Sequence, residues 1–114
     1  MTWRHGLFVL VLLGVLIAAL LPGPQAPDFG AGDKINHIAA FVTLAVMAAW
    51  AWPHARLALI ALALSAFGGA IEGLQALPAI ARDAEWADWL ADSAAVAAVL
   101  LIVAVVRRLT SSAR

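Results

Sequence analysis

Residues 57–77 have the sequence LALIALALSAFGGAIEGLQAL, and Pro78 follows them. A helix that crosses the hydrocarbon core of a membrane needs about 17–25 mostly apolar residues, and this run is long enough. We expect a helix, because a strand with an open edge would leave unpaired backbone groups in hydrocarbon. Glu72 and Gln75 interrupt the run near its end, at a place where apolar residues would carry no cost.

Three further apolar runs flank this one, and prolines or the pair Arg107–Arg108 follow them. Of the 114 residues, 65% are hydrophobic and 12% are charged, whereas about a quarter are charged in soluble domains. The sequence therefore predicts an all-α polytopic membrane protein, a single domain over residues 1–114. The four transmembrane helices are expected at residues 6–21, 35–52, 57–77 and 86–106.

The first run has a second interpretation, as a cleaved signal peptide. Arg4 precedes the apolar stretch, and small residues come after it. A cut after Ala26 would have Pro24 two positions before it and Pro27 directly after it, which is a poor cleavage context. A retained first helix, without ionisable residues over 6–21, is the favoured prediction.

Basic residues predict the orientation, because the cytoplasmic loops of membrane proteins carry an excess of lysine and arginine. With four spans, the N-terminus, the middle loop and the C-terminus share one side. The basic residues on that side are Arg4, Arg56, Arg107, Arg108 and Arg114, against Lys34 and Arg82 on the other. Both termini are therefore expected in the cytoplasm, and the loops at residues 22–34 and 78–85 outside.

Composition excludes several classes of function. The formal net charge is zero, with 7 basic and 7 acidic residues, which argues against nucleic acid as a partner. The chain has no cysteine, which excludes disulfides, thiol nucleophiles and thiolate metal sites.

The acidic residues gather on the outer side of the predicted membrane. They are Asp28, Asp33, Glu72, Asp83, Glu85, Asp88 and Asp92. Helix residues three or four apart share a face, so Glu72 and Gln75 lie together, as do Asp88 and Asp92. His37 follows Asp33 by four and Lys34 by three, and Arg82 lies in the loop between the last two helices. We expect these side chains to converge just below the outer surface.

Several of these residues also have purely structural interpretations. Asp33 is a plausible helix cap, and Asp88 suits the first turn of a helix, whose dipole favours an acid. His37 is equally consistent with an interfacial polar residue. Ser65, Gly69 and Gly73 repeat every four residues, which predicts a seam for close helix packing. Two tryptophan pairs predict interfacial belts, Trp50 with Trp52 and Trp86 with Trp89.

The polar residues occur in an order that resembles the VanZ-like family of small bacterial membrane proteins. That family shows Asp-Lys then His, Glu-x-x-Gln, Arg, and Asp-x-x-x-Asn-x-x-Gly. The matching residues are Asp33, Lys34, His37, Glu72, Gln75, Arg82 and Asp88. Asp92 stands in place of the usual Asn, and Ala95 in place of the usual Gly. The resemblance spans residues 33–95.

The resemblance implies a multi-pass protein of the bacterial cytoplasmic membrane, in a family named for low-level resistance to teicoplanin-type glycopeptides. We expect a site for a cell-envelope lipid headgroup, a lipid-linked cell-wall precursor or a lipoglycopeptide. Lys34, Arg82 and His37 would bind its anionic group, and the carboxylates would accept hydrogen bonds. The candidate ligand-binding residues are Asp33, Lys34, His37, Glu72, Gln75, Arg82, Asp88 and Asp92.

Three other functions stay open. The first is an intramembrane enzyme on a lipid-linked substrate, with Glu72 and either Asp88 or His37 as its acid–base pair. A metal held by His37, Glu72, Asp88 and Asp92 is disfavoured because the spacing matches no known metal signature, and no cofactor is implied. The second is a small transporter, and the third is a structural partner in a larger membrane complex.

The binding hypothesis makes a direct prediction for Arg82. Replacing Arg82 by alanine removes a charge-assisted donor to an anionic headgroup, and it should abolish binding of such a lipid. Binding of the purified variant to the lipid measures this, and unchanged binding would contradict the role given to Arg82.

Overall fold

The computed structural model describes residues 2–21, 33–79 and 86–112, without the side chains of residues 33, 34 and 112. Its helices are α1 (Trp3–Leu20), α2 (Asp33–Ala51), α3 (Leu57–Gln75) and α4 (Trp86–Ser112), and the described residues contain no strand. The all-α prediction is confirmed. Within the described ranges, α1, α3 and α4 are long and apolar enough to cross a membrane, whereas the apolar part of α2, Ile35–Ala51, is shorter.

Six helix ends differ from the predicted ones, by one to six residues. α1 begins at Trp3, so Arg4 and His5 lie inside it, and the prediction of a first helix without ionisable residues is wrong. The backbone N–H of Thr2 donates to His5 Nδ1 at 2.9 Å, which satisfies a free amide at this helix start. α3 ends at Gln75 because Pro78 disfavours helical backbone before it. α4 continues past the arginine pair to Ser112.

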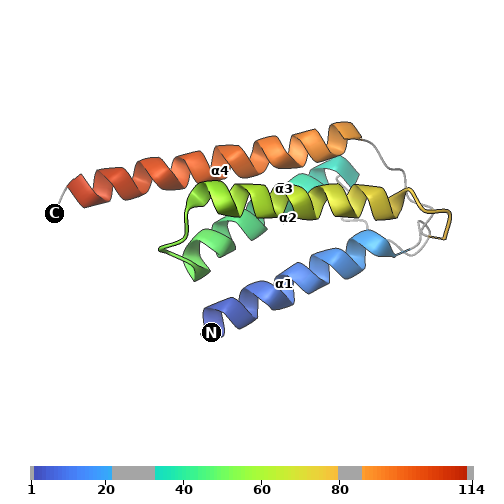
Figure 1. The fold of residues 1–114 in the computed structure, drawn as a ribbon, viewed down its shortest axis with the longest axis horizontal. Coiled ribbons are helices and arrows are strands. Elements are labelled where there is room, and N and C mark those ends of the chain that lie inside the picture. Colours follow the sequence, from blue (N-terminus) through green and yellow to red (C-terminus); the bar gives the residue numbers. More distant parts are fainter. Residues whose placement is uncertain (1, 22–32, 80–85, 113–114) are drawn as a thin grey trace.

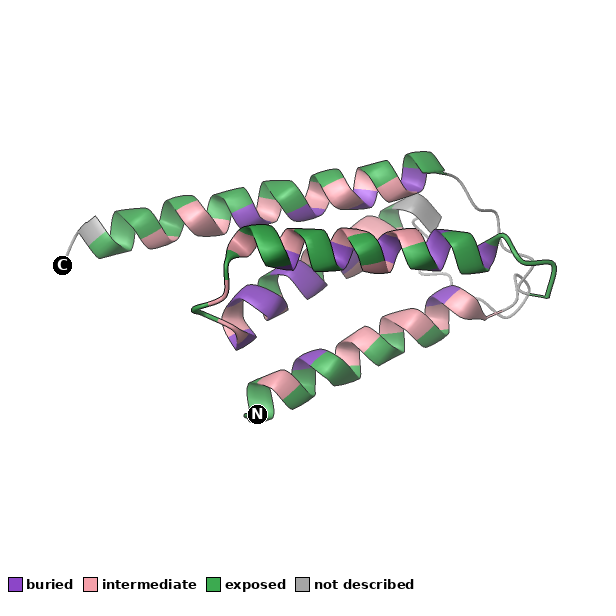
Figure 2. Cartoon of the chain, viewed as in Figure 1, coloured by how far each residue is buried: buried purple, intermediate pink, exposed green. Residues whose placement is uncertain are grey.

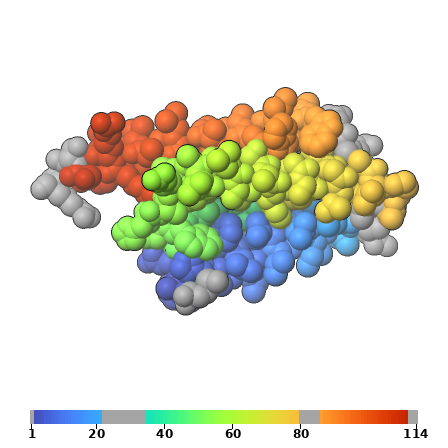
Figure 3. All heavy atoms as spheres, viewed as in Figure 1, coloured from blue at the N-terminus to red at the C-terminus, as the bar shows by residue number. Residues whose placement is uncertain are grey.

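The four helices run up and down beside one another (Figure 1). The start of α1, the turn between α2 and α3, and the end of α4 lie at one end of the bundle. The end of α1, the start of α2, the end of α3 and the start of α4 lie at the other. α2 and α3 each contact both α1 and α4, and Figure 3 shows α3 between α4 and α1 on one face. The central pair of helices therefore holds the outer two.

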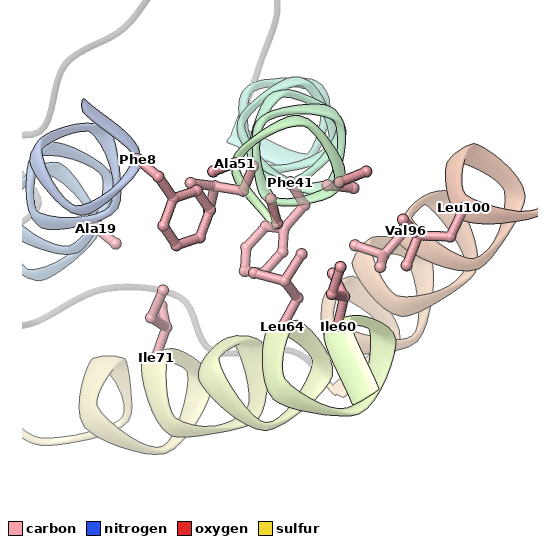
Figure 4. Close-up of a cluster of buried hydrophobic side chains, with 13 residues drawn as sticks. Phe8, Ala19, Phe41, Ala51, Ile60, Leu64, Ile71, Val96 and Leu100 are labelled. Atoms are coloured by element: carbon pink, nitrogen blue, oxygen red, sulfur yellow. The ribbon is translucent and has the colours of Figure 1, made fainter. Parts of the chain in front are cut away.

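A hydrophobic core fills the space between α2, α3 and α4 (Figures 2 and 4). Phe41, Leu64, Ile60 and Val96 point toward one another in this space, and each is at least nine-tenths buried. α1 contributes little to the core, because its buried residues are Phe8 and Ala19. Burial of a large apolar side chain in a close-packed interior fixes the relative rotation of the helices that carry it.

The small residues of α3 do not act as one seam. A Cβ on Gly68 would lie 3.2 Å from Phe41 Cζ, and one on Gly69 would lie 3.3 Å from Trp89 Nε1. A Cβ on Gly73 would have no described atom of another element within 4 Å. Among the described residues, the predicted packing role is therefore found at Gly69 and not at Gly73. Gly68, outside the predicted repeat, has it too, since it admits the rings of Phe41 from α2 and Trp89 from α4.

Leucine substitutions at Gly68 and Gly73 test this difference. Gly68→Leu should lower the free energy of unfolding by about 1–3 kcal/mol, because the new side chain must displace Phe41 and Trp89. Gly73→Leu, the matched control, should have a much smaller effect. Unfolding of both variants in detergent micelles measures this, and equal losses would contradict the assigned packing.

Candidate functional site

The buried faces of three helices change from apolar to polar toward the same end of the bundle. On α4, Val96 and Leu100 are followed toward the helix start by Asp92 and Asp88, each four residues apart. On α3, the buried residues beyond Ile71 include Glu72 and Gln75, and on α2 His37 lies four residues before the buried Phe41. Residues at this spacing share a helix face, so the predicted convergence of polar faces is found.

His37 lies between two carboxylates from different helices. Its Nδ1 is 3.5 Å from Asp92 Oδ2 and 3.9 Å from Glu72 Oε1. The side chain of His37 is 10% exposed, whereas those of Glu72 and Asp92 are 2% and 3% exposed. Protonated His37 would pair with both acids at once, and the low dielectric around buried charges strengthens that attraction. We call His37, Glu72 and Asp92 the polar cluster.

Asp88 is buried one helical turn before Asp92, on the same face of α4. Asp33 and Lys34 form the first two residues of α2, but their side chains lie outside the described residues, as does all of Arg82. The structure therefore brings His37, Glu72 and Asp92 together, and it places Asp88 beside them. The predicted cationic part of the site is not described.

Gln75 connects the polar end of α3 to α1. Its Nε2 donates a buried hydrogen bond of 2.9 Å to the carbonyl of Ala19, near the end of α1. The last carbonyls of a helix have no partner within the helix, so this bond satisfies one of them. Gln75 therefore joins α1 to α3 at the end that contains the polar cluster. Its predicted role in ligand binding is a separate matter.

A second set of polar contacts lies below the cluster and was missed by the sequence interpretation. Trp89 Nε1 donates to the carbonyl of Ser65 at 2.8 Å, and the hydroxyls of Ser65 and Ser93 are 2.8 Å apart. Trp89 is thus half-buried against α3, and it joins α4 to α3 in addition to its predicted place at the membrane interface. The signal was available in the spacing, because Ser93 lies four residues after Trp89 and the adjacent Gly68 and Gly69 leave room for its ring.

Two buried acceptors of this end have no hydrogen bond among the described residues: Asp92 Oδ1 and Gln75 Oε1. Buried polar atoms normally have a partner in the protein, in ordered water or in a ligand. Within the described ranges, no group of three His, Asp or Glu side chains is arranged to hold a metal ion. The acceptors of Asp92 and Gln75 can therefore take hydrogen bonds from ordered water or from a ligand.

A double-mutant cycle tests the contact between His37 and Asp92. His37→Gln and Asp92→Asn should show a coupling of about 0.5–3 kcal/mol in the free energy of unfolding, because each side chain faces the other. Thr43→Ala is the matched control on α2, since the Thr43 hydroxyl is exposed and donates to Ala39 of its own helix. Its coupling with Asp92→Asn should stay within about 0.5 kcal/mol. Equal coupling in both cycles would contradict the contact.

Comparison with known proteins finds no family model, no curated protein and no solved structure that matches the chain. The likeness of residues 33–95 to the VanZ-like family, drawn from the order and spacing of motifs, stays a prediction. Asp92, where this chain departs from that pattern, is the carboxylate that lies 3.5 Å from His37.

Proposed function

We propose that the protein is a VanZ-like integral membrane protein whose polar cluster binds the headgroup of a cell-envelope lipid. The observation that carries the proposal is the burial of His37, Glu72 and Asp92 between three apolar helices. An ionisable side chain within a membrane costs free energy, by about 2.5–3.5 kcal/mol at the centre and less near the surface. Intramembrane ionisable groups are for this reason a sign of a functional site.

The depth of the cluster suits a headgroup. Asp92 lies six residues after the start of α4, which corresponds to about 9 Å along the helix. Glu72 lies three residues before the end of α3, about 5 Å along it. The polar layer of a bilayer extends about 5–8 Å beyond the hydrocarbon core on each side. A headgroup would therefore reach the cluster by entering only the first turns of the helices.

The core below the cluster favours binding over transport. Leu44, Leu64, Val96 and Leu100 are 0–4% exposed and occupy the space between α2, α3 and α4. A transporter needs a polar path that reaches both ends of its helices in turn. The described residues instead confine the polar groups of the cluster to one end.

We further propose that the chain spans the membrane four times with both termini in the cytoplasm, so that the cluster faces the exterior. The basic residues support this orientation, because most of them belong to the termini and the middle turn. A lipid-linked cell-wall precursor or a lipoglycopeptide would then meet the cluster in the outer leaflet. Binding of such a lipid is the proposed route to glycopeptide tolerance.

A second candidate function is acid–base catalysis on a lipid-linked substrate. The distances of 3.5 Å and 3.9 Å from His37 to its two carboxylates favour it, because an imidazole beside a carboxylate can take up and return a proton. The sequence-based pair of Glu72 with His37 is compatible with these distances. The two functions differ in whether the bound lipid is converted.

Lipid analysis of the purified protein tests the proposal. Wild-type protein in mild detergent should retain a specific envelope lipid, identified by mass spectrometry of the extract. Glu72→Gln keeps the size of the side chain but removes its charge, and it should reduce retention about tenfold, equivalent to about 1.4 kcal/mol. Thr43→Ala should retain the lipid at the wild-type level.

Two outcomes would contradict binding at the cluster. One is equal lipid retention by wild type and Glu72→Gln, and the other is the absence of any enriched lipid from wild type. Chemical conversion of the retained lipid during incubation would assign the site to catalysis instead.

A further inference from the structure

The end of the bundle opposite the polar cluster carries two arginines that converge on the end of α2. Arg107 Nη2, from α4, donates to the carbonyl of Ala49 at 2.8 Å, and Arg4 Nη1, from α1, donates to the carbonyl of Trp50 at 3.5 Å. α2 has no basic residue of its own in its last turn. Two neighbouring helices therefore supply the cations that the negative end of the α2 dipole favours.

Aromatic side chains hold Arg4 in place. Its guanidinium lies 4.9 Å from the ring centroid of Trp50, a distance typical of a cation–π contact. The Trp3 and Trp50 rings meet edge to face at 5.3 Å, and the rings of Phe8 and Trp52 do so at 5.1 Å. Arg4 lies in the first turn of α1, where a helix dipole disfavours a cation, so these contacts offset an unfavourable position.

The same end has an uncompensated positive charge. Residues 2–8, 50–57 and 104–112 contain four arginines and neither Asp nor Glu. Arg4, Arg56 and Arg108 are exposed. A guanidinium has five N–H donors, and the bond from Arg4 to Trp50 uses one of them. Exposed arginine donors are therefore available at this end, and Arg4 lies against Trp3 and Trp50, residues of the kind found at the headgroup level of membranes.

We propose that this end of the bundle binds anionic phospholipids by their phosphate groups, with Arg4, Arg56 and Arg108 as separate ligands on its surface. The planar donors of arginine match the oxygens of phosphate and of carboxylate, and phosphate is the anionic group that phospholipids present. The fixed position of Arg4 lowers the ordering cost of binding, since its side chain is already held by Trp50. The surface is separate from the polar cluster, so Glu72→Gln should leave it unchanged.

Native mass spectrometry of the protein in neutral detergent tests this site with two lipids, dioleoyl phosphatidylglycerol and dioleoyl phosphatidylcholine. Wild type should bind phosphatidylglycerol at least about 25-fold more tightly than phosphatidylcholine. Each arginine near an anionic headgroup contributes about a fivefold gain in affinity. Arg56→Gln combined with Arg108→Gln should therefore weaken binding of phosphatidylglycerol about 25-fold and leave phosphatidylcholine unchanged. Thr110→Ala combined with Ser111→Ala, at the same end, should behave as wild type.

Further outcomes decide against the site. Equal affinity of wild type for the two lipids would overturn it, as would full phosphatidylglycerol affinity in the double arginine variant. Displacement of the lipid by excess inorganic phosphate would assign the site to free phosphate. Should the variant fail to fold, wild type in about 1 M salt provides the test, because the Debye length falls from about 10 Å at 0.1 M to about 3 Å. An unchanged preference for phosphatidylglycerol there would contradict an arginine–phosphate contact.

Discussion

An imidazole between two buried carboxylates is the constraint on which this bundle depends. His37, Glu72 and Asp92 come from three different helices, and the His37 imidazole lies 3.5 Å from the Asp92 carboxylate and 3.9 Å from that of Glu72. Breaking a buried ionic group costs more than its formation gains, because the remaining charge is left in a low dielectric. The cluster therefore acts together with the apolar core below it in fixing the rotation of α2, α3 and α4.

The two ends of the bundle carry side chains of opposite charge. At one end, acids on α3 and α4 face a histidine on α2. At the other, arginines from α1 and α4 supply donors to the carbonyls that end α2. α1 is held at both ends by specific polar contacts, through Arg4 and through the bond from Gln75 to Ala19, although few of its residues are buried. These contacts can keep α1 packed against the bundle although it buries little surface.

Much of this arrangement could be predicted from the sequence. The apolar runs and their prolines predicted the helices. The spacing of Glu72 with Gln75 and of Asp88 with Asp92 predicted which residues share a polar helix face. Contacts between helices could not be predicted in the same way, because spacing within one helix does not determine which backbone atom of another helix lies opposite. The bond from Trp89 to Ser65 and the bond from Gln75 to Ala19 are of this kind. Gly73 was misassigned for the same reason, since a repeat of small residues does not show which of them meets a neighbour.

Nuclear magnetic resonance of the ¹⁵N-labelled His37 imidazole tests the central contact most directly. The signal can be assigned by its loss in His37→Gln and then followed in Glu72→Gln, Asp92→Asn and Thr43→Ala. The account predicts that the Nδ1 resonance shifts in both acid variants and keeps its position in Thr43→Ala. A resonance that is insensitive to both acid substitutions would place His37 away from the carboxylates and contradict the account.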